Sequence, residues 1–391
     1  MGFWRKKKRI FLDYASTTPV LLEVKRAMGP YFSEHFGNPA TLYQEGIDAK
    51  KAVEQARKKI ARILGSRSEE IIFTGSGTES ANLALWGVIN SYQGKKAPHI
   101  VTTTIEHPAV REVAKAIKAV GGNVTLIHPN ENGLVTASSI REALREETIL
   151  VSVMYANNEI GTVNPIREIG KVIREYKEEK GTSLYFHTDA SQAPNYLPLN
   201  VSSLGVDLMT LDASKVYGPK GVGMLYARRG TRLLPIMYGG GQEYGLRSGT
   251  ENVAGIVGMA VSLEMATRDR EKEAKYLSFL RDYAIEKILK QFPKASLNGS
   301  CAERLPNNIN ICIPGMNAEF AVYLLDALGI SVAYASSCRT LAEGASSYVI
   351  EALSKKECAV SSLRITMGRG TRKNDIDVLL KALPSIVLRA R

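Results

Sequence analysis

Short apolar runs alternate with helical patterns between about residues 70 and 230. The runs are rich in β-branched and aromatic residues, as strands are, and polar turns separate them from the helical stretches. Such alternation is typical of βαβ units, in which a mostly parallel sheet is covered by helices on both faces. The runs that predict strands are residues 71–74, 99–103, 148–154, 184–187 and 207–211.

Helical and strand-like patterns flank this region on both sides. Before it, apolar residues recur at roughly helical spacing: Ile47, Val53, Ala56, Ile60 and Ile63. After it, a long, charged, amphipathic stretch runs from about residue 255 to Phe292, and strand-like runs follow at 308–313 and 362–367. We therefore expect an α/β fold with a large domain on a mostly parallel sheet and a smaller α+β domain from about residue 260.

Composition is that of a soluble globular protein. The chain has 391 residues, 45% of them hydrophobic and 23% charged, and no stretch approaches the ~18 apolar residues that a membrane span requires. The net charge of +12 raises the question of nucleic-acid binding, but most basic residues are interleaved with acidic ones, as on solvated helix faces. We expect neither direct nucleic-acid binding nor membrane association.

One basic run, Arg-Lys-Lys-Lys-Arg at residues 5–9, departs from this interleaving. It could contact a membrane surface, an acidic partner or nucleic acid, and a solvated terminus is the simpler interpretation. The apolar residues after it are too few for a secretory signal.

Four cysteines lack the spacing of metal ligands: Cys301, Cys312, Cys338 and Cys358. Nothing in their pattern indicates disulfides. We expect reduced thiols, a cytoplasmic location and no metal site. Cys312, inside an apolar strand, is interpreted as a packing residue.

Lys215 occupies the position where a predicted strand ends and the chain turns back through Gly-Pro-Lys-Gly. Removal from water disfavours an ammonium group, and a neutral amine can form a Schiff base with an aldehyde. The alternative is a solvated surface charge, which is the usual fate of a lysine. Position alone does not decide between the two.

Three further groups follow predicted strands in the same way. Residues 74–80, Thr-Gly-Ser-Gly-Thr-Glu-Ser, form a glycine-rich turn before a helix, which suits a phosphate or is an ordinary helix cap. Asp189 could pair with a cationic ring nitrogen or cap a helix. His107 could stack on a ring and move protons, or open the helix beside Pro108. All lie where open α/β sheets bind ligands.

Taken together, the ordered motifs resemble those of the cysteine desulfurases, in the class V, fold-type I branch of enzymes that use pyridoxal 5′-phosphate (PLP). The resemblance covers nearly the whole chain. The motifs that carry it are residues 11–19, 36–39, 73–80, 106–107, 157–161, 187–192, 215–221 and 247–250.

The resemblance implies a role for each matching residue. Lys215 would bind the cofactor aldehyde, Asp189 the pyridinium nitrogen, and His107 would stack on the ring and transfer protons. The other cofactor contacts that it implies are Gly77, Thr78 and Ser214 at the phosphate, Asn158 and Gln192 at the ring oxygen, and Thr250 at the phosphate of a neighbouring subunit. The last match implies a homodimer.

The resemblance also implies the substrate and the reaction. Arg364 would bind the carboxylate of L-cysteine, assisted by Asn38. Cys338, in a Ser- and Ala-rich segment, would take the sulfur as a persulfide and leave L-alanine. Arg339 could favour the thiolate or point to solvent. The sulfur would pass to an iron–sulfur scaffold or a tRNA-thiolating enzyme.

Two positions depart from the family pattern. Asp212 stands where the family has a hydroxyl residue, and Ser214 stands where it has a histidine. A carboxylate at 212 would repel a phosphate unless it turned away or paired with a base, so we expect weaker cofactor binding than is usual. The loop before Cys338 differs as well, which bears on the choice of acceptor.

Other functions remain open at this point. A selenocysteine lyase, or another class V lyase or aminotransferase, would use a similar site, although Cys338 argues against transamination. A weakly PLP-binding sulfur-relay or scaffold protein is favoured only by Asp212 and Ser214. In every case we expect residues 1–20 to pack near the small domain, 21–258 to form the PLP-binding domain, and 259–391 to form the small domain with the Cys338 loop.

Overall fold

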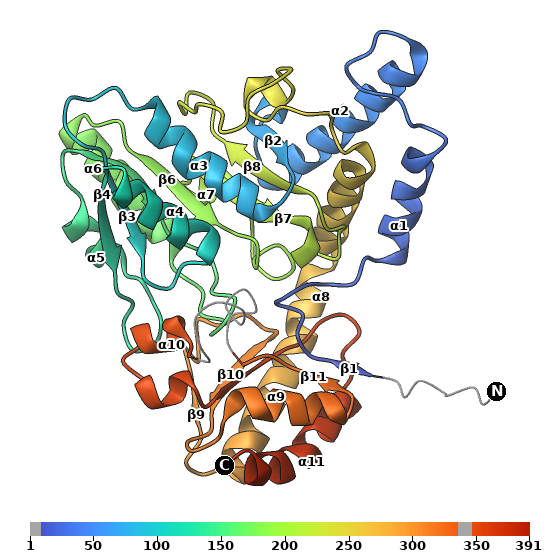
Figure 1. Ribbon diagram of the computed structural model, residues 1–391, viewed down its shortest axis with the longest axis vertical. Coiled ribbons are helices and arrows are strands. Elements are labelled where there is room, and N and C mark those ends of the chain that lie inside the picture. The colour runs from blue at the N-terminus through green and yellow to red at the C-terminus, as the bar shows by residue number, and fades with distance from the viewer. Residues whose placement is uncertain (1–8, 335–345) are drawn as a thin grey trace.

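A seven-stranded sheet, in the order β2-β8-β7-β6-β5-β3-β4, forms the centre of the larger part of the molecule (Figure 1). The computed structural model describes residues 9–334 and 346–391. Strands β3 to β7 are parallel to one another, whereas β8 is antiparallel to both of its neighbours. The strands are β2 (Ile71–Thr74), β3 (His99–Thr103), β4 (Asn123–Ile127), β5 (Thr148–Ser152), β6 (Tyr185–Asp189), β7 (Leu208–Asp212) and β8 (Gly223–Ala227).

Helices cover both faces of this sheet, as its alternating side chains require. On β7, for example, Leu208 packs in the cluster with α3 and α4, while Met209 packs in the cluster with α2, α6 and α8. The helices of this part are α1 (Leu22–Met28), α2 (Gln44–Leu64), α3 (Gly77–Ser91), α4 (Pro108–Ala119), α5 (Ala137–Ala143), α6 (Ile166–Lys180) and α7 (Val201–Leu204). Short 3₁₀ turns are η1 (Gly29–Phe32), η2 (Ser68–Glu70), η3 (Ala213–Lys215) and η4 (Glu243–Gly245).

Helix α8 (Val253–Gln291) connects the large sheet with a smaller α+β part. That part holds an antiparallel sheet in the order β12-β10-β9 and a short parallel pair of β1 with β11. Its elements are β1 (Ile10–Phe11), β9 (Ser296–Leu297), β10 (Asn308–Cys312), α9 (Ala318–Ala327), β11 (Ile330–Ser331), α10 (Tyr348–Ala352), η5 (Lys356–Ala359), β12 (Ser362–Thr366) and α11 (Lys373–Arg389).

The proposed domain limits stay a prediction. The division at residue 258 falls inside α8, whose first turns pack in the core of the large sheet and whose residues Leu277, Leu280 and Ile288 pack in the second core. The pairing of β1 with β11 places the start of the described chain against the smaller part.

The five predicted strands agree with the structure, whereas β4 and β8 were missed. Strand β4 lies at the edge of the sheet and is partly exposed, so it lacks a continuous apolar run. Strand β8 begins at Gly223, directly after a turn, and glycine is depleted in strands.

The expectation of reduced thiols is wrong for two of the cysteines. Cys312 of β10 and Cys358 of η5 form a disulfide, with Cα atoms 5.2 Å apart. Cys312 is indeed buried, but the tertiary fold supplies its partner from 46 residues away, and no local spacing predicts that. Cys301 is free and exposed.

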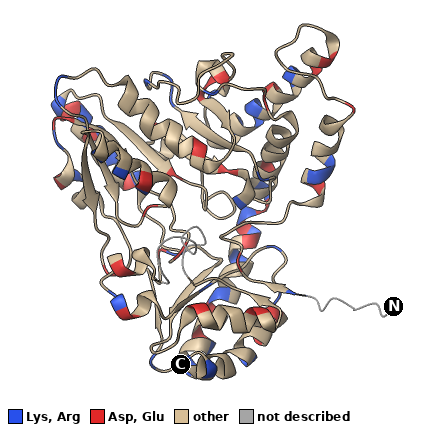
Figure 2. Cartoon of the chain, in the orientation of Figure 1, with Lys and Arg blue, Asp and Glu red and all other residues tan. Residues whose placement is uncertain are grey.

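Charged residues of both signs are interspersed over the described helices, as Figure 2 shows. This agrees with the interpretation of solvated helix faces. Among the described residues, no helix is both long and apolar enough to cross a membrane.

Candidate active site

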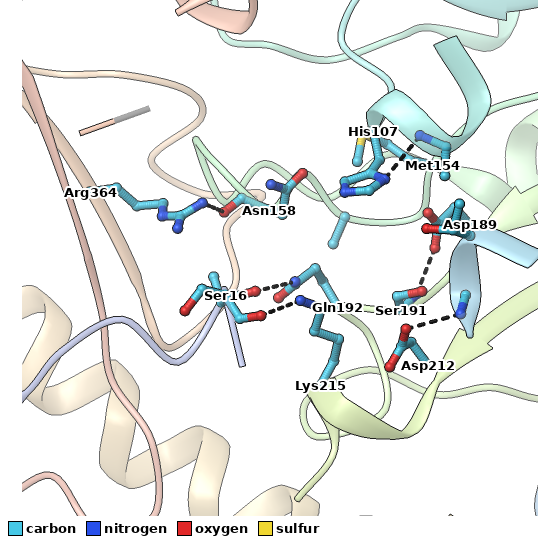
Figure 3. Close-up of a pocket in the computed structure, with 15 residues that line it drawn as sticks. Ser16, His107, Met154, Asn158, Asp189, Ser191, Gln192, Asp212, Lys215 and Arg364 are labelled. Atoms are coloured by element: carbon cyan, nitrogen blue, oxygen red, sulfur yellow. Dashed lines mark hydrogen bonds between the residues drawn. The ribbon is translucent and has the colours of Figure 1, made fainter. Parts of the chain in front are cut away.

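A cavity of about 190 Å³ lies where the carboxyl ends of the parallel strands meet the chain start and the smaller part (Figure 3). His107 follows β3, Asn158 follows β5, Asp189 ends β6 and Lys215 follows β7, and all four line the cavity. The fold therefore brings together groups that are far apart in the sequence, as parallel sheets do at this edge.

Four more predicted residues line the same cavity. Gly77 and Thr78 begin α3, Gln192 follows β6, and Arg364 comes from β12 of the smaller part. The side-chain amide of Gln192 donates to the Ala15 carbonyl at 3.0 Å, which holds this side chain against the segment before α1.

Residues 16–18, which precede α1, hold the turn that carries Lys215. Thr18 donates its N–H and its hydroxyl to the Ser214 carbonyl, each at 2.9 Å, and accepts from the Tyr217 N–H. Tyr217 has a φ of 59°, a left-handed conformation that is rare for a bulky residue. The Lys215 ammonium donates to the Ser16 carbonyl. Ser16 and Thr18 were not assigned from sequence, although they belong to the motif at residues 11–19.

His107 opens helix α4, as one interpretation expects, and it also lines the cavity. Its Nδ1 accepts from the Ala109 N–H at 3.1 Å, so the ring caps α4 beside Pro108 while it lines the cavity. Because Nδ1 is an acceptor, the neutral ring carries its proton on Nε2. Asp189 likewise accepts from the Ser191 N–H at 3.0 Å through Oδ1 and lines the cavity.

Burial favours the neutral form of two groups close to Asp189, Glu106 and His187. Burial raises the pKa of Glu106 to about 8, although the Met154 N–H and the Thr103 hydroxyl donate to its Oε1. Burial lowers the pKa of His187 to about 4, and its ring nitrogens contact the Ser152 and Thr210 hydroxyls. In these neutral forms the two groups add no charge beside Asp189.

Arg364 is held at the other side of the cavity. Its side chain is 1% exposed, and Nη2 bonds Asp13 Oδ1 at 2.8 Å while Nη1 donates to the Asn158 carbonyl at 3.3 Å. These two acceptors fix the plane of the guanidinium, whose fork matches a carboxylate. Asp13 was not predicted as a site residue, and the motif at residues 11–19 was the available signal.

The glycine-rich turn at residues 74–80 leads into α3, and the Gly77 N–H there donates to the Asp212 carboxylate. Asp212 Oδ2 accepts from the Gly77 N–H at 2.9 Å, and Oδ1 accepts from the N–H and hydroxyl of Ser214 at 2.8 and 2.6 Å. As the sequence indicates, Ser76 caps α3 by accepting from the Glu79 N–H. Asp212 neither turns away nor pairs with a base in the described chain, but takes the donors predicted for a phosphate.

Three of the predicted residues that the structure describes, Asn38, Ser214 and Thr250, do not line the cavity. Asn38 and Thr250 are exposed in the single chain. Cys338 lies outside the described residues. Within the described ranges, no group of three or more His, Cys, Asp or Glu side chains could hold a metal ion.

One end of the cavity is lined by Lys215, Asp189 and His107, and we call it the ring end. It fits the ring and aldehyde of a PLP-like cofactor. A lysine amine, a carboxylate and an imidazole surround one space, which are the groups that hold an aldehyde and a pyridinium. The phosphate end, formed by Gly77, Thr78 and Ser214, has the right donors, but Asp212 accepts from three of them: the Gly77 N–H, the Ser214 N–H and the Ser214 hydroxyl.

Comparisons with known proteins agree with this arrangement. The family described as Aminotransferase class-V matches residues 10–379. The Cysteine desulfurase IscS of Dictyoglomus turgidum is 42% identical over 386 residues, which cover 98% of this chain and 96% of that protein. The chain belongs to the cysteine desulfurase family. The predicted family is thereby confirmed.

Solved structures also match the fold. A structure described as a NifS-like protein superposes with a TM-score of 0.90 at 32% identity, covering 98% of this chain and 100% of that one. A second, described as SspA in complex with cysteine, has a TM-score of 0.78 at 32% identity and covers 92% of this chain and 99% of that one. These similarities confirm the predicted fold class, a fold-type I architecture on a mostly parallel sheet.

Proposed function

We propose that this chain converts L-cysteine to L-alanine with PLP as cofactor and takes the sulfur on Cys338 as a persulfide. Membership of the cysteine desulfurase family makes it an enzyme of the sulfurtransferase type. The observation that carries the proposal is the single cavity on which Lys215, Asp189, His107 and Arg364 converge.

The ring end provides the groups for proton movement. When bound, PLP supplies an electron sink for the reaction at the substrate α-carbon. Lys215, Asp189 and His107 line the cavity: Lys215 would hold the cofactor aldehyde, Asp189 would pair with the pyridinium nitrogen, and His107 would exchange a proton through Nε2. Burial favours the neutral forms of Glu106 and His187, which limits competing charge beside Asp189.

Arg364 binds the substrate carboxylate. Its guanidinium has five donors, so it can keep the Asn158 carbonyl and present a fork to the substrate. The bond to Asp13 orients the side chain before the substrate arrives.

Sulfur transfer falls to Cys338. Its thiolate attacks the substrate sulfur, an S–S bond forms as the substrate C–S bond breaks, and alanine is the carbon product after protonation. The similarity to proteins named Cysteine desulfurase IscS supports an iron–sulfur scaffold as the acceptor, and a tRNA-thiolating enzyme is the alternative acceptor. The proposal includes a homodimer, in which Thr250 reaches the cofactor phosphate of the partner subunit. It also includes a cytoplasmic location.

The test is release of alanine and sulfide from cysteine with added PLP and a thiol reductant. We expect Cys338→Ala to lose sulfide release, because no thiol accepts the sulfur. Cys301→Ala is the matched control, since Cys301 is free and exposed, and it should keep the parent rate. A Cys338→Ala variant as fast as the parent would show that the nucleophile is another group.

The second candidate is a sulfur-relay protein that binds PLP weakly, and Asp212 at the phosphate end is the observation that favours it. A protein without the absorbance band of lysine-bound pyridoxal, even with excess PLP, would support this candidate. Comparing cysteine with selenocysteine separates a desulfurase from a selenocysteine lyase.

A further inference from the structure

The carboxylate of Asp212 is built into the phosphate end of the cavity. It accepts from the Gly77 N–H at 2.9 Å and from the Ser214 hydroxyl at 2.6 Å. Both are donors that an anion at the start of α3 would use. Of the nearby amides, Glu79 N–H is already bound to Ser76 and Ser214 N–H to Asp212.

The backbone leaves little freedom for this carboxylate. Asp212 ends β7, where it pairs with Gly223 of β8, and it caps η3. A Cβ atom on Gly77 would lie 3.0 Å from Asp212 Cβ and 3.2 Å from Oδ2. The space beside the Gly77 N–H is therefore already filled, and a phosphate can reach it only if the Asp212 side chain leaves.

Charge repulsion opposes the presence of the Asp212 carboxylate and a phosphate together beside the Gly77 N–H. Within residues 9–334 and 346–391, Asp212 makes hydrogen bonds to neutral donors and no ion pair. No salt bridge within these residues therefore offsets the repulsion between its carboxylate and a phosphate dianion at hydrogen-bond distance.

We propose that Asp212 competes with the cofactor phosphate for the Gly77 N–H and the Ser214 hydroxyl, so that this chain selects its cofactor mainly by the aldehyde and ring. The phosphate then adds little affinity, and unphosphorylated pyridoxal binds nearly as well as PLP. The inference rests on the proposed function, because it requires that Lys215 binds a pyridoxal aldehyde.

The test is equilibrium titration of the cofactor-free protein with PLP and with pyridoxal, followed by the absorbance of the lysine-bound form. We expect the parent to bind the two within about tenfold of each other. Asp212→Asn should bind PLP at least about tenfold more tightly and leave pyridoxal binding within about twofold, because only PLP carries the phosphate. Asp377→Asn is the matched control, at a side chain of α11 that is 41% exposed, and it should change neither affinity.

Asp212→Ser provides a second variant should Asp212→Asn fold poorly, because its shorter side chain withdraws from Gly77. Unchanged PLP affinity in a folded variant, or an equal change for PLP and pyridoxal, overturns the inference and leaves the proposed function intact. If neither the parent nor any variant shows the absorbance of the lysine-bound form with PLP or pyridoxal, the proposed function is wrong. The inference that rests on it is then wrong as well.

Discussion

The two ends of the cavity use similar groups in opposite ways. At the ring end, His107, Asp189 and Lys215 each make a hydrogen bond within the protein and still line the cavity. At the phosphate end, Gly77 and Ser214 direct their donors to Asp212. The comparison shows that a family motif can be kept at one end of a site while the donors at the other end form hydrogen bonds within the protein.

The largest expected effect comes from removing the amine at the ring end. Lys215→Ala should lower alanine formation at least about a thousandfold, because no other group holds the cofactor aldehyde next to the substrate. Alanine production measures it, with circular dichroism as the check on folding. Lys220→Ala, in the exposed turn, is the control and should stay near the parent rate. Substantial activity in Lys215→Ala would show that the ring end does not depend on Lys215 and would contradict the comparison.

A smaller effect is expected from the neutral carboxyl behind the ring end. Folding raises the pKa of Glu106 from its usual 4.5 to about 8, so the folded state keeps a proton that the unfolded state releases between these values. The free energy of unfolding should therefore fall as the pH rises through this window. Glu106→Gln removes that contribution.

Thermal unfolding at pH 5 and pH 8 measures this difference. The Tm of the parent should fall by about 3 °C more than that of Glu106→Gln between the two values. Exposed Glu357→Gln should follow the parent. Parallel curves for the parent and Glu106→Gln would mean that Glu106 is ionised in the folded protein and adds charge beneath Asp189.

The smallest effect is expected at the phosphate end. Ser214→Ala should change the PLP affinity by less than about threefold, because the hydroxyl already donates to Asp212. In the Asp212→Asn background the same substitution should weaken PLP binding more, since the hydroxyl is then available to the phosphate. Equilibrium PLP titration of the four proteins measures this coupling. Additive effects would place Ser214 outside the phosphate contacts.

The sequence predicts the ring end well because its residues follow strands with strong apolar patterns. Asp189, His107 and Lys215 lie directly after such runs, and the order of their motifs supplies the rest. Strand β4 escaped prediction because an exposed edge strand has no continuous apolar run.

Contacts between distant segments could not be predicted in the same way. The charge of Asp212 is evident in the sequence, but its bond to the Gly77 N–H spans 135 residues. The bond from Arg364 to Asp13 spans 351 residues, and the Cys312–Cys358 disulfide depends on how η5 packs beside β10. Tertiary packing decides these partners, and no local pattern records it.

The central claim, that this cavity holds the cofactor through one lysine, can be tested by chemical reduction. The PLP-treated protein is reduced with borohydride, digested, and searched by mass spectrometry for a phosphopyridoxyl group. The account predicts that this group lies on the peptide that contains Lys215 and disappears in Lys215→Ala. A group found on Lys220 or on another lysine, with Lys215 unmodified, would contradict it.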